Sequence, residues 1–222
     1  AAAVIHGARV VSYDELRAAA RGWDARLRAV DFRPGERIGL FAENGPFFVA
    51  AYLGTIRAGL CSVPFQVDCS RETFERIVTS TGMSRILVSS RLHSRVQPWA
   101  KELGVELIVE SDEPPDEAAL PPAEVDPRRD LAAIVYTSGS TGDVKGVMVT
   151  HRNILVNTED IIGYVGISED DRAMCVLPFY YCFGTSLLHT HLMAGGSLVI
   201  NNRFMFPEKV LDEMRDRRCT GL

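Results

Sequence analysis

Residues 136–146 read Tyr-Thr-Ser-Gly-Ser-Thr-Gly-Asp-Val-Lys-Gly, and they follow directly on the apolar run 131–136. A short apolar run that ends in a Gly-rich polar segment predicts a buried strand followed by a loop. The loop 137–146 contains three glycines, four hydroxyl side chains and Lys145. Glycines let backbone amides approach a polyanion, while hydroxyls and a lysine add donors. The stretch therefore indicates a phosphate-binding loop.

Two other interpretations of this loop stay open. It is a polar surface segment without function, or Ser138 or Ser140 pairs with Lys145 as nucleophile and base of an amidase-like hydrolase. The hydrolase interpretation lacks support elsewhere, because the chain has no Gly-x-Ser-x-Gly sequence. The order of residues also matches neither a Walker A loop nor a dinucleotide-binding fingerprint.

Outward from the loop, short apolar runs alternate with amphipathic segments. Strands are expected at 38–42, 61–64, 85–88, 105–109, 131–136, 147–149, 173–177 and 197–200. Helices are expected at 46–57, 71–80, 94–103, 151–164, 185–193 and 207–217. This alternation is typical of parallel βαβ units covered on both faces. The sequence thus predicts an α/β fold of layered, mostly parallel sheets flanked by helices.

The first residues predict a hairpin over 4–11 and then a helix. Ser12 is the expected N-cap, with Glu15 at capping-box spacing. The helix that follows places Leu16, Ala19, Ala20, Trp23 and Leu27 on one face.

The segment 111–127 divides the chain, since it holds five of the eleven prolines and six acidic residues. Such a composition excludes a regular ladder or helix and predicts an exposed connector. We therefore expect a first α/β lobe over 1–127, which includes the connector, and a second lobe over 128–222.

Composition narrows the class of protein. The 222 residues carry a formal net charge of -5, and no basic block stands out, which gives no case for nucleic acid binding. Five scattered cysteines argue against a disulfide framework or structural zinc. The longest apolar stretch, 47–56, is too short to span a bilayer. A cytoplasmic protein without metal-ligating residues of its own is expected.

Residues 136–147 resemble the signature loop of the adenylate-forming superfamily, which includes acyl-CoA synthetases, fatty acyl-AMP ligases, luciferases and nonribosomal peptide adenylation domains. Val144 departs from the family, which usually has proline there. Further segments resemble family motifs in the same order: Val11-Ser-Tyr-Asp-Glu-Leu16, Gly35-Glu-Arg-Ile-Gly-Leu40, Ala58-Gly-Leu-Cys-Ser-Val-Pro64, Gly146-Val-Met-Val-Thr-His151-Arg-Asn153 and Leu177-Pro-Phe-Tyr-Tyr-Cys-Phe-Gly184.

The resemblance implies that a carboxylic acid attacks ATP to give acyl-AMP and pyrophosphate, and that the thiol of CoA or of a carrier-protein phosphopantetheine then takes the acyl group. Mg²⁺ bridges the phosphates in this scheme. The residues implied to bind the β- and γ-phosphates are Thr137, Ser138, Gly139, Ser140, Thr141, Gly142 and Lys145.

The same resemblance places the acyl pocket at Phe179, Tyr181, Phe183 and Gly184. Tyr181 stands where many relatives carry histidine. Amino-acid-activating members carry an aspartate in this region, but residues 179–186 contain no acid. Because a buried ammonium without a partner is costly, we expect an acyl or aryl acid without an α-amino group.

The adenine, ribose and catalytic-lysine motifs of the family do not occur before Leu222. We therefore expect the chain to be an N-terminal portion that contains no catalytic residue of its own and is inactive without the C-terminal domain. A nucleotide-binding module without catalysis is the alternative. We also expect self-association through the surface that the missing part leaves open. His189 and His191 are assigned no metal, and Cys182 is expected to be a buried, inert thiol.

Overall fold

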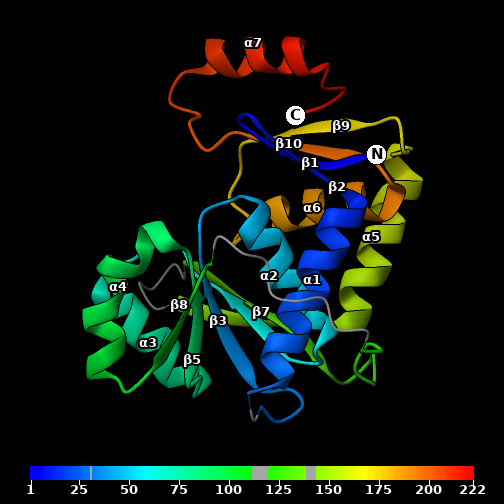
Figure 1. The fold of residues 1–222 in the computed structure, drawn as a ribbon. Helices are drawn as coiled ribbons and strands as arrows, with labels where there is room; N and C mark the ends of the chain where they lie inside the picture. The colour runs from blue at the N-terminus through cyan, green and yellow to red at the C-terminus, as the bar shows by residue number, and fades with distance from the viewer. Residues whose placement is uncertain (31, 112–119, 139–143) are drawn as a thin grey trace.

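Two sheets and seven helices make up the computed structural model, which describes residues 1–30, 32–111, 120–138 and 144–222 (Figure 1). The strands are β1 Ala2–His6, β2 Arg9–Ser12, β3 Arg37–Phe41, β4 Cys61–Pro64, β5 Arg85–Val88, β6 Glu106–Val109, β7 Leu131–Ser138, β8 Val144–Thr150, β9 Arg172–Cys175 and β10 Ser197–Ile200. The helices are α1 Tyr13–Arg28, α2 Pro46–Arg57, α3 Arg71–Thr81, α4 Ser90–Glu102, α5 His151–Val165, α6 Cys182–Ala194 and α7 Pro207–Arg217.

The elements form five layers. Helices α1, α2, α5 and α6 lie between the two sheets, α3 and α4 cover the outer face of the larger sheet, and α7 lies on the smaller one (Figure 1). The core follows this order, because one cluster joins Val4 and Leu198 of the smaller sheet to Leu40 and Phe48 of the larger half. The predicted class, an α/β fold with mostly parallel sheets flanked by helices, is confirmed.

The strand order shows how distant segments share a sheet. The smaller sheet runs β2-β1-β10-β9 and the larger one β6-β5-β3-β4-β7-β8. The expected boundary at residue 127 does not separate them, since β1 and β2 pair with β10 from the far end of the chain while β7 and β8 complete the larger sheet. The physical reason is strand pairing: a hairpin at the N-terminus has a free edge that β10 fills in parallel.

Local signals place several elements as predicted. Ser12 caps α1 through a complete capping box with Glu15, and β4, α2, β10 and α7 have the expected bounds. The 120–127 part of the connector has no helix or strand and is fastened to the end of α2, where the Ala123 amide donates to the Arg57 carbonyl at 3.0 Å. Residues 112–119 lie outside the described part of the chain.

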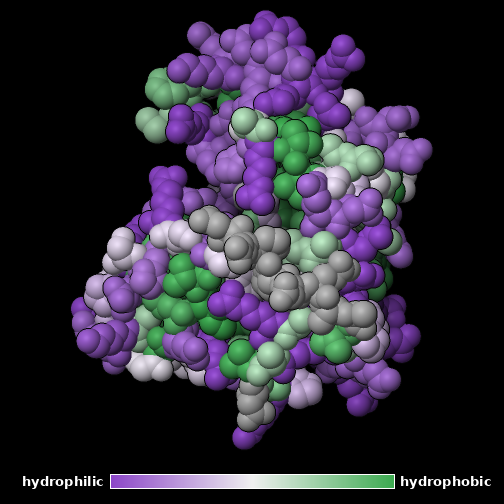
Figure 2. Space-filling view, in the orientation of Figure 1, coloured by the Kyte–Doolittle hydropathy of each residue, from purple (hydrophilic) through white to green (hydrophobic). Residues whose placement is uncertain are grey.

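The surface is mainly hydrophilic around α7, and a hydrophobic patch lies over β8 (Figure 2). Val147 and Met148 of this edge strand are 50% and 69% exposed. Among the helices that the structure describes, none combines the length and apolar character needed to cross a bilayer.

The Tyr52 hydroxyl and His189 Nε2, which join α2 to α6 between the sheets, lie 3.0 Å apart, and the two rings stack. Burial lowers the pKa of His189 to about 4. The unfolded chain, with a histidine pKa of about 6.5, binds more protons between these two values. The stability that depends on neutral His189 is therefore complete above pH 6.5 and is lost as the pH falls towards 4.

We expect acidification from pH 7.5 to 5 to lower the free energy of unfolding by about 2 kcal/mol through this residue. His151 and His191 also have a pKa lowered by burial, so the test is the difference between wild type and His189→Gln in urea unfolding at both pH values. An equal pH dependence in the two proteins would contradict the prediction.

Candidate functional site

The Gly-rich phosphate loop connects β7 and β8, which pair as an antiparallel hairpin at the edge of the larger sheet. The strands extend further into the motif than predicted: β7 continues through Ser138, and β8 begins at Val144. The expected loop 137–146 is therefore shorter, because cross-strand pairing continues to the pair Ser138–Val144. Gly139, Ser140, Thr141 and Gly142 lie outside the described residues.

Tyr136 and Gly146 form one side of this hairpin and have a structural role. They are paired across the strands, and the Tyr136 hydroxyl lies 2.6 Å from Ser80 Oγ on α3. A β-carbon at Gly146 would come within 2.9 Å of Ile134 Cγ2 and 3.1 Å of Tyr136 Cζ. Glycine at 146 thus makes room for the tyrosine ring, which anchors the base of the hairpin to α3.

Thr137 and Lys145 form the opposite side. They are the next pair in the register, and both are exposed. Side chains of a directly opposed antiparallel pair project from the same face, about 5 Å apart at Cβ. Because successive residues alternate in a strand, this face is the one opposite Tyr136. A hydroxyl and a primary ammonium therefore stand together at the mouth of the hairpin, free of the core.

The hairpin opens at the carboxyl edge of the larger sheet. β7 runs parallel to β4, and β4 and β5 run parallel to β3, so their carboxyl ends share one edge. The chain passes from β3 to neighbours on both sides, which makes this edge a topological switch point. Open α/β sheets bind ligands outside the carboxyl ends of strands at such points.

The second predicted motif, residues 177–184, follows β9 in the other sheet and reaches towards the same edge. Asn44, just after β3, binds it directly: its Nδ2 donates to the Leu177 carbonyl and its Oδ1 accepts from the Phe179 amide, each at 2.8 Å. Burial raises the pKa of Tyr180 to about 12, and the Asp68 carboxylate, on the segment after β4, acts in the same direction. The two motifs thus belong to one region of the molecule.

The four predicted pocket residues have different environments. Phe179 is fully buried and packs on Phe48 of α2, with ring centroids 5.3 Å apart. Gly184 is also buried, and a β-carbon there would meet the Pro178 carbonyl oxygen at 2.3 Å. Tyr181 and Phe183 are 41% and 59% exposed. Only these last two present a ring outward, while Phe179 and Gly184 fix the backbone that carries them.

Helix α6 begins at Cys182, three residues before its predicted start, so Phe183 and Gly184 belong to its first turn. Cys182 is exposed, and the expectation of a buried thiol there is wrong. The reason is its place at the start of the helix, ahead of the turns that pack between the sheets.

Beyond Phe183, α6 and α5 enclose a hollow of about 410 Å³. Its lining combines apolar side chains of both helices with a few polar groups near β9: Ile161, Val165, Ile167, Phe183, Leu187, Asp171, Thr190, His191 and Thr220. Within the described part of the chain, no group of three or more His, Cys, Asp or Glu side chains is arranged to hold a metal ion.

Sequence reasoning missed Asn44 and Asp68. Each stands shortly after a buried parallel strand, in a segment that precedes a helix. Polar residues at the carboxyl ends of parallel strands are a usable signal, because these ends meet at a binding edge.

A family model described as "AMP-binding enzyme" matches residues 1–222. Feruloyl-CoA synthase from an Amycolatopsis species is 30% identical over 227 residues, which cover 99% of this chain and 44% of the relative. Linear gramicidin synthase from Brevibacillus parabrevis is 29% identical over 220 residues, 97% of this chain and 3% of the relative.

Solved structures agree. ATP-bound MatB from Rhodopseudomonas palustris superposes with a TM-score of 0.86 at 26% identity, over 96% of this chain and 44% of that one. A fatty acyl-adenylate ligase from L. pneumophila, in complex with acyl adenylate and pyrophosphate, gives 0.89 at 25% identity, over 99% and 40%. The chain spans less than half the length of these relatives.

Proposed function

The chain belongs to the family of AMP-binding enzymes, and on that premise we propose that the protein containing it activates a carboxylic acid with ATP, forming acyl-AMP and pyrophosphate. The observation that carries this proposal is the pair Thr137 and Lys145, exposed side by side at the mouth of the β7–β8 hairpin. A cation and a hydroxyl held on a rigid hairpin suit the β- and γ-phosphates, whose charge grows as pyrophosphate departs. Ser138 and residues 139–142 complete the proposed phosphate-binding set.

In this scheme the protein contributes positioning and charge neutralisation. The acid must lie in line with the α-phosphorus, which requires the phosphate-binding hairpin and the acyl-binding residues to be held at a fixed separation. Anchoring of Tyr136 to α3 and of residues 177–179 to Asn44 supports such rigidity. Mg²⁺ fits as an ion bound mainly by the substrate phosphates and water, because Mg²⁺ sites need only one or two protein ligands beside phosphates.

We propose an acyl or aryl acid without an α-amino group as substrate, with Tyr181 and Phe183 as pocket residues. Support comes from the absence of acid between residues 179 and 186 and from the two exposed rings. The thiol acceptor is CoA or a carrier-protein phosphopantetheine. Feruloyl-CoA synthase and 3-hydroxybenzoate--CoA/4-hydroxybenzoate--CoA ligase from Thauera aromatica are relatives whose names state aryl acids and CoA.

The proposal extends to the division of labour along the gene product. Catalytic residues lie outside residues 1–222, and this chain alone binds ATP without turnover. Isothermal titration of the 222-residue chain with Mg-ATP, beside ATP–pyrophosphate exchange by the full gene product, tests both halves. Binding without exchange by the full product would favour a silent nucleotide-binding module, and robust exchange by the 222 residues alone would overturn the division.

A substrate panel tests the acid class. Aryl acids, fatty acids and free amino acids are compared in the exchange assay with the full gene product. Preferential exchange with amino acids would overturn the substrate assignment, and Asp68→Asn would then show whether the Asp68 carboxylate binds the ammonium group.

A further inference from the structure

The side chain of Asn44 connects the two halves of the candidate site. Asn44 is 5% exposed and directly follows the β3 end of the larger sheet. Its amide binds the segment after β9 of the smaller sheet through the Leu177 carbonyl and the Phe179 amide, both at 2.8 Å. Its own main-chain carbonyl accepts from Asn202 Nδ2, again at 2.8 Å, so Asn44 is itself fixed to the end of β10.

The pattern of these bonds explains why the residue is asparagine. One side chain must donate to a carbonyl and accept from an amide two residues further along, as a neighbouring strand would. A primary amide offers a donor and an acceptor in one plane, whereas a carboxylate offers acceptors alone. At a buried position, either backbone group left without its partner is costly.

Phe179 is the point at which this clamp acts. Its amide is bound by Asn44, its carbonyl accepts from Thr185 Oγ1 at 2.6 Å, and its ring packs on Phe48. Tyr180 and Tyr181 come next in the chain, with ring centroids 4.6 Å apart. The direction of these rings therefore depends on how Phe179 is held.

We propose that Asn44 is a positioning residue, which sets the affinity for the acid substrate by holding residues 177–181 against the carboxyl edge of the larger sheet. Asn44 acts through Phe179 and does not touch the substrate. The inference rests on the proposed function. It adds that the acid site depends on an amide from the β3 end, while the phosphate hairpin, anchored separately through Tyr136 and Ser80, does not.

The kinetic test uses Asn44→Ala and Asn44→Asp in the full gene product, assayed by ATP–pyrophosphate exchange. Asn44→Asp retains the volume and the acceptor but places a carboxylate against the Leu177 carbonyl, so a cavity cannot explain its effect. We expect both variants to raise the KM for the acid about tenfold or more, with the KM for ATP unchanged, because misplacement of a binding wall is costly. Tyr52→Phe is the matched control, since it also removes a bond between the same two parts of the chain, α2 and α6, but leaves 177–181 untouched.

Hydrogen exchange provides a readout that is independent of activity. The Phe179 amide is expected to exchange faster in both Asn44 variants than in wild type and Tyr52→Phe. Unchanged protection of Phe179, or an equal rise in the KM for acid and ATP together with a lower melting temperature, would overturn the positioning role. If the wild type exchanges pyrophosphate with no acid, the proposed function fails, and with it the claim about acid affinity. The exchange data would then still show whether Asn44 holds the segment.

Discussion

Replacing Lys145 by alanine is expected to lower the ATP–pyrophosphate exchange rate of the full gene product by about 100- to 1,000-fold, the usual cost of removing one preorganised donor from a developing anion. Lys145 is exposed and paired with Thr137 in the hairpin register, so its ammonium is available to phosphate and supports nothing else that the structure describes. The free energy of unfolding should therefore not change, which separates this result from a folding defect.

Two further variants sharpen the experiment. Lys101→Ala removes another exposed lysine, on α4, and should leave exchange intact. Lys145→Arg retains the charge but changes its shape, and an intermediate rate is expected, because arginine and lysine bind phosphate with different geometry. Exchange by Lys145→Ala at the rates of wild type and Lys101→Ala would remove Lys145 from the phosphate site.

The fold was largely predictable because its signals are local. Capping at Ser12, the buried runs of β4 and β10, and Pro207 in the first turn of α7 each determine a boundary from a few neighbouring residues. Helix α4 was predicted too short, since its first turn, Ser-Arg-Leu-His, carries little apolar periodicity and begins after an N-cap serine whose side chain makes no capping bond. The family resemblance supplied the ATP chemistry, which local pattern does not encode.

What the sequence did not show is long-range. The pairing of β1 with β10 joins residues almost 200 positions apart and determines which segments form the smaller sheet. Likewise, only three-dimensional structure distinguishes Phe179, which faces Phe48 in the core, from Tyr181 and Phe183, which face outward. Composition treats these rings alike, because alternation in a short irregular segment has no fixed period.

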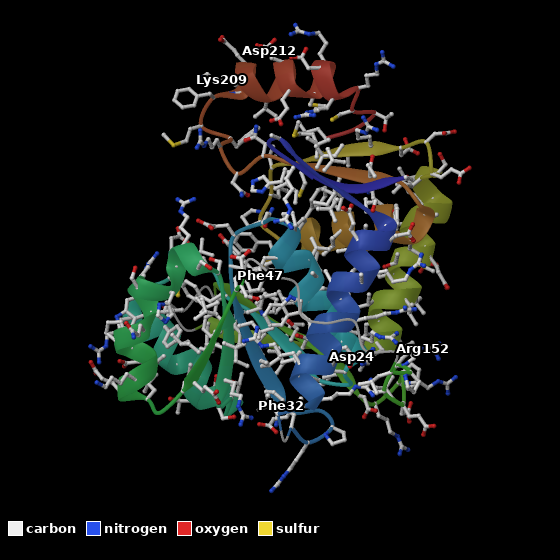
Figure 3. All side chains as sticks on the ribbon, in the orientation of Figure 1. Asp24, Phe32, Phe47, Arg152, Lys209 and Asp212 are labelled. Atoms are coloured by element: carbon white, nitrogen blue, oxygen red, sulfur yellow. The ribbon has the colours of Figure 1, made fainter. Side chains whose placement is uncertain are left out.

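The second large effect is expected in stability, at Asp24 of α1. Its side chain is 1% exposed and forms ion pairs with Arg28 Nε at 2.5 Å and Arg57 Nε at 2.9 Å. Figure 3 marks Asp24 on α1, in the layer between the sheets where α1 packs on α2. Because Arg57 is the last residue of α2, one carboxylate connects the two helices.

Asp24→Ala should lower the free energy of unfolding by about 3–5 kcal/mol, since removing one partner leaves the other charges desolvated without compensation. Arg28 and Arg57 are only 28% and 24% exposed, so water cannot fully replace the carboxylate. Asp24→Asn retains the shape and should cost less than alanine, which separates loss of charge from loss of packing. Urea unfolding followed by the fluorescence of the neighbouring Trp23 measures both, with an unchanged m-value as the sign of two-state behaviour.

The matched control is Asp14→Ala, which removes the Asp14–Arg17 pair from the first turn of the same helix. That pair is 3.5 Å long, with side chains 89% and 61% exposed, and exposed pairs contribute about 0–1 kcal/mol. The two carboxylates lie on one helix and each binds arginine, so the comparison isolates burial as the variable. Equal losses for Asp14→Ala and Asp24→Ala would mean that Arg28 and Arg57 find new partners, and that the α1–α2 layer is held by packing alone.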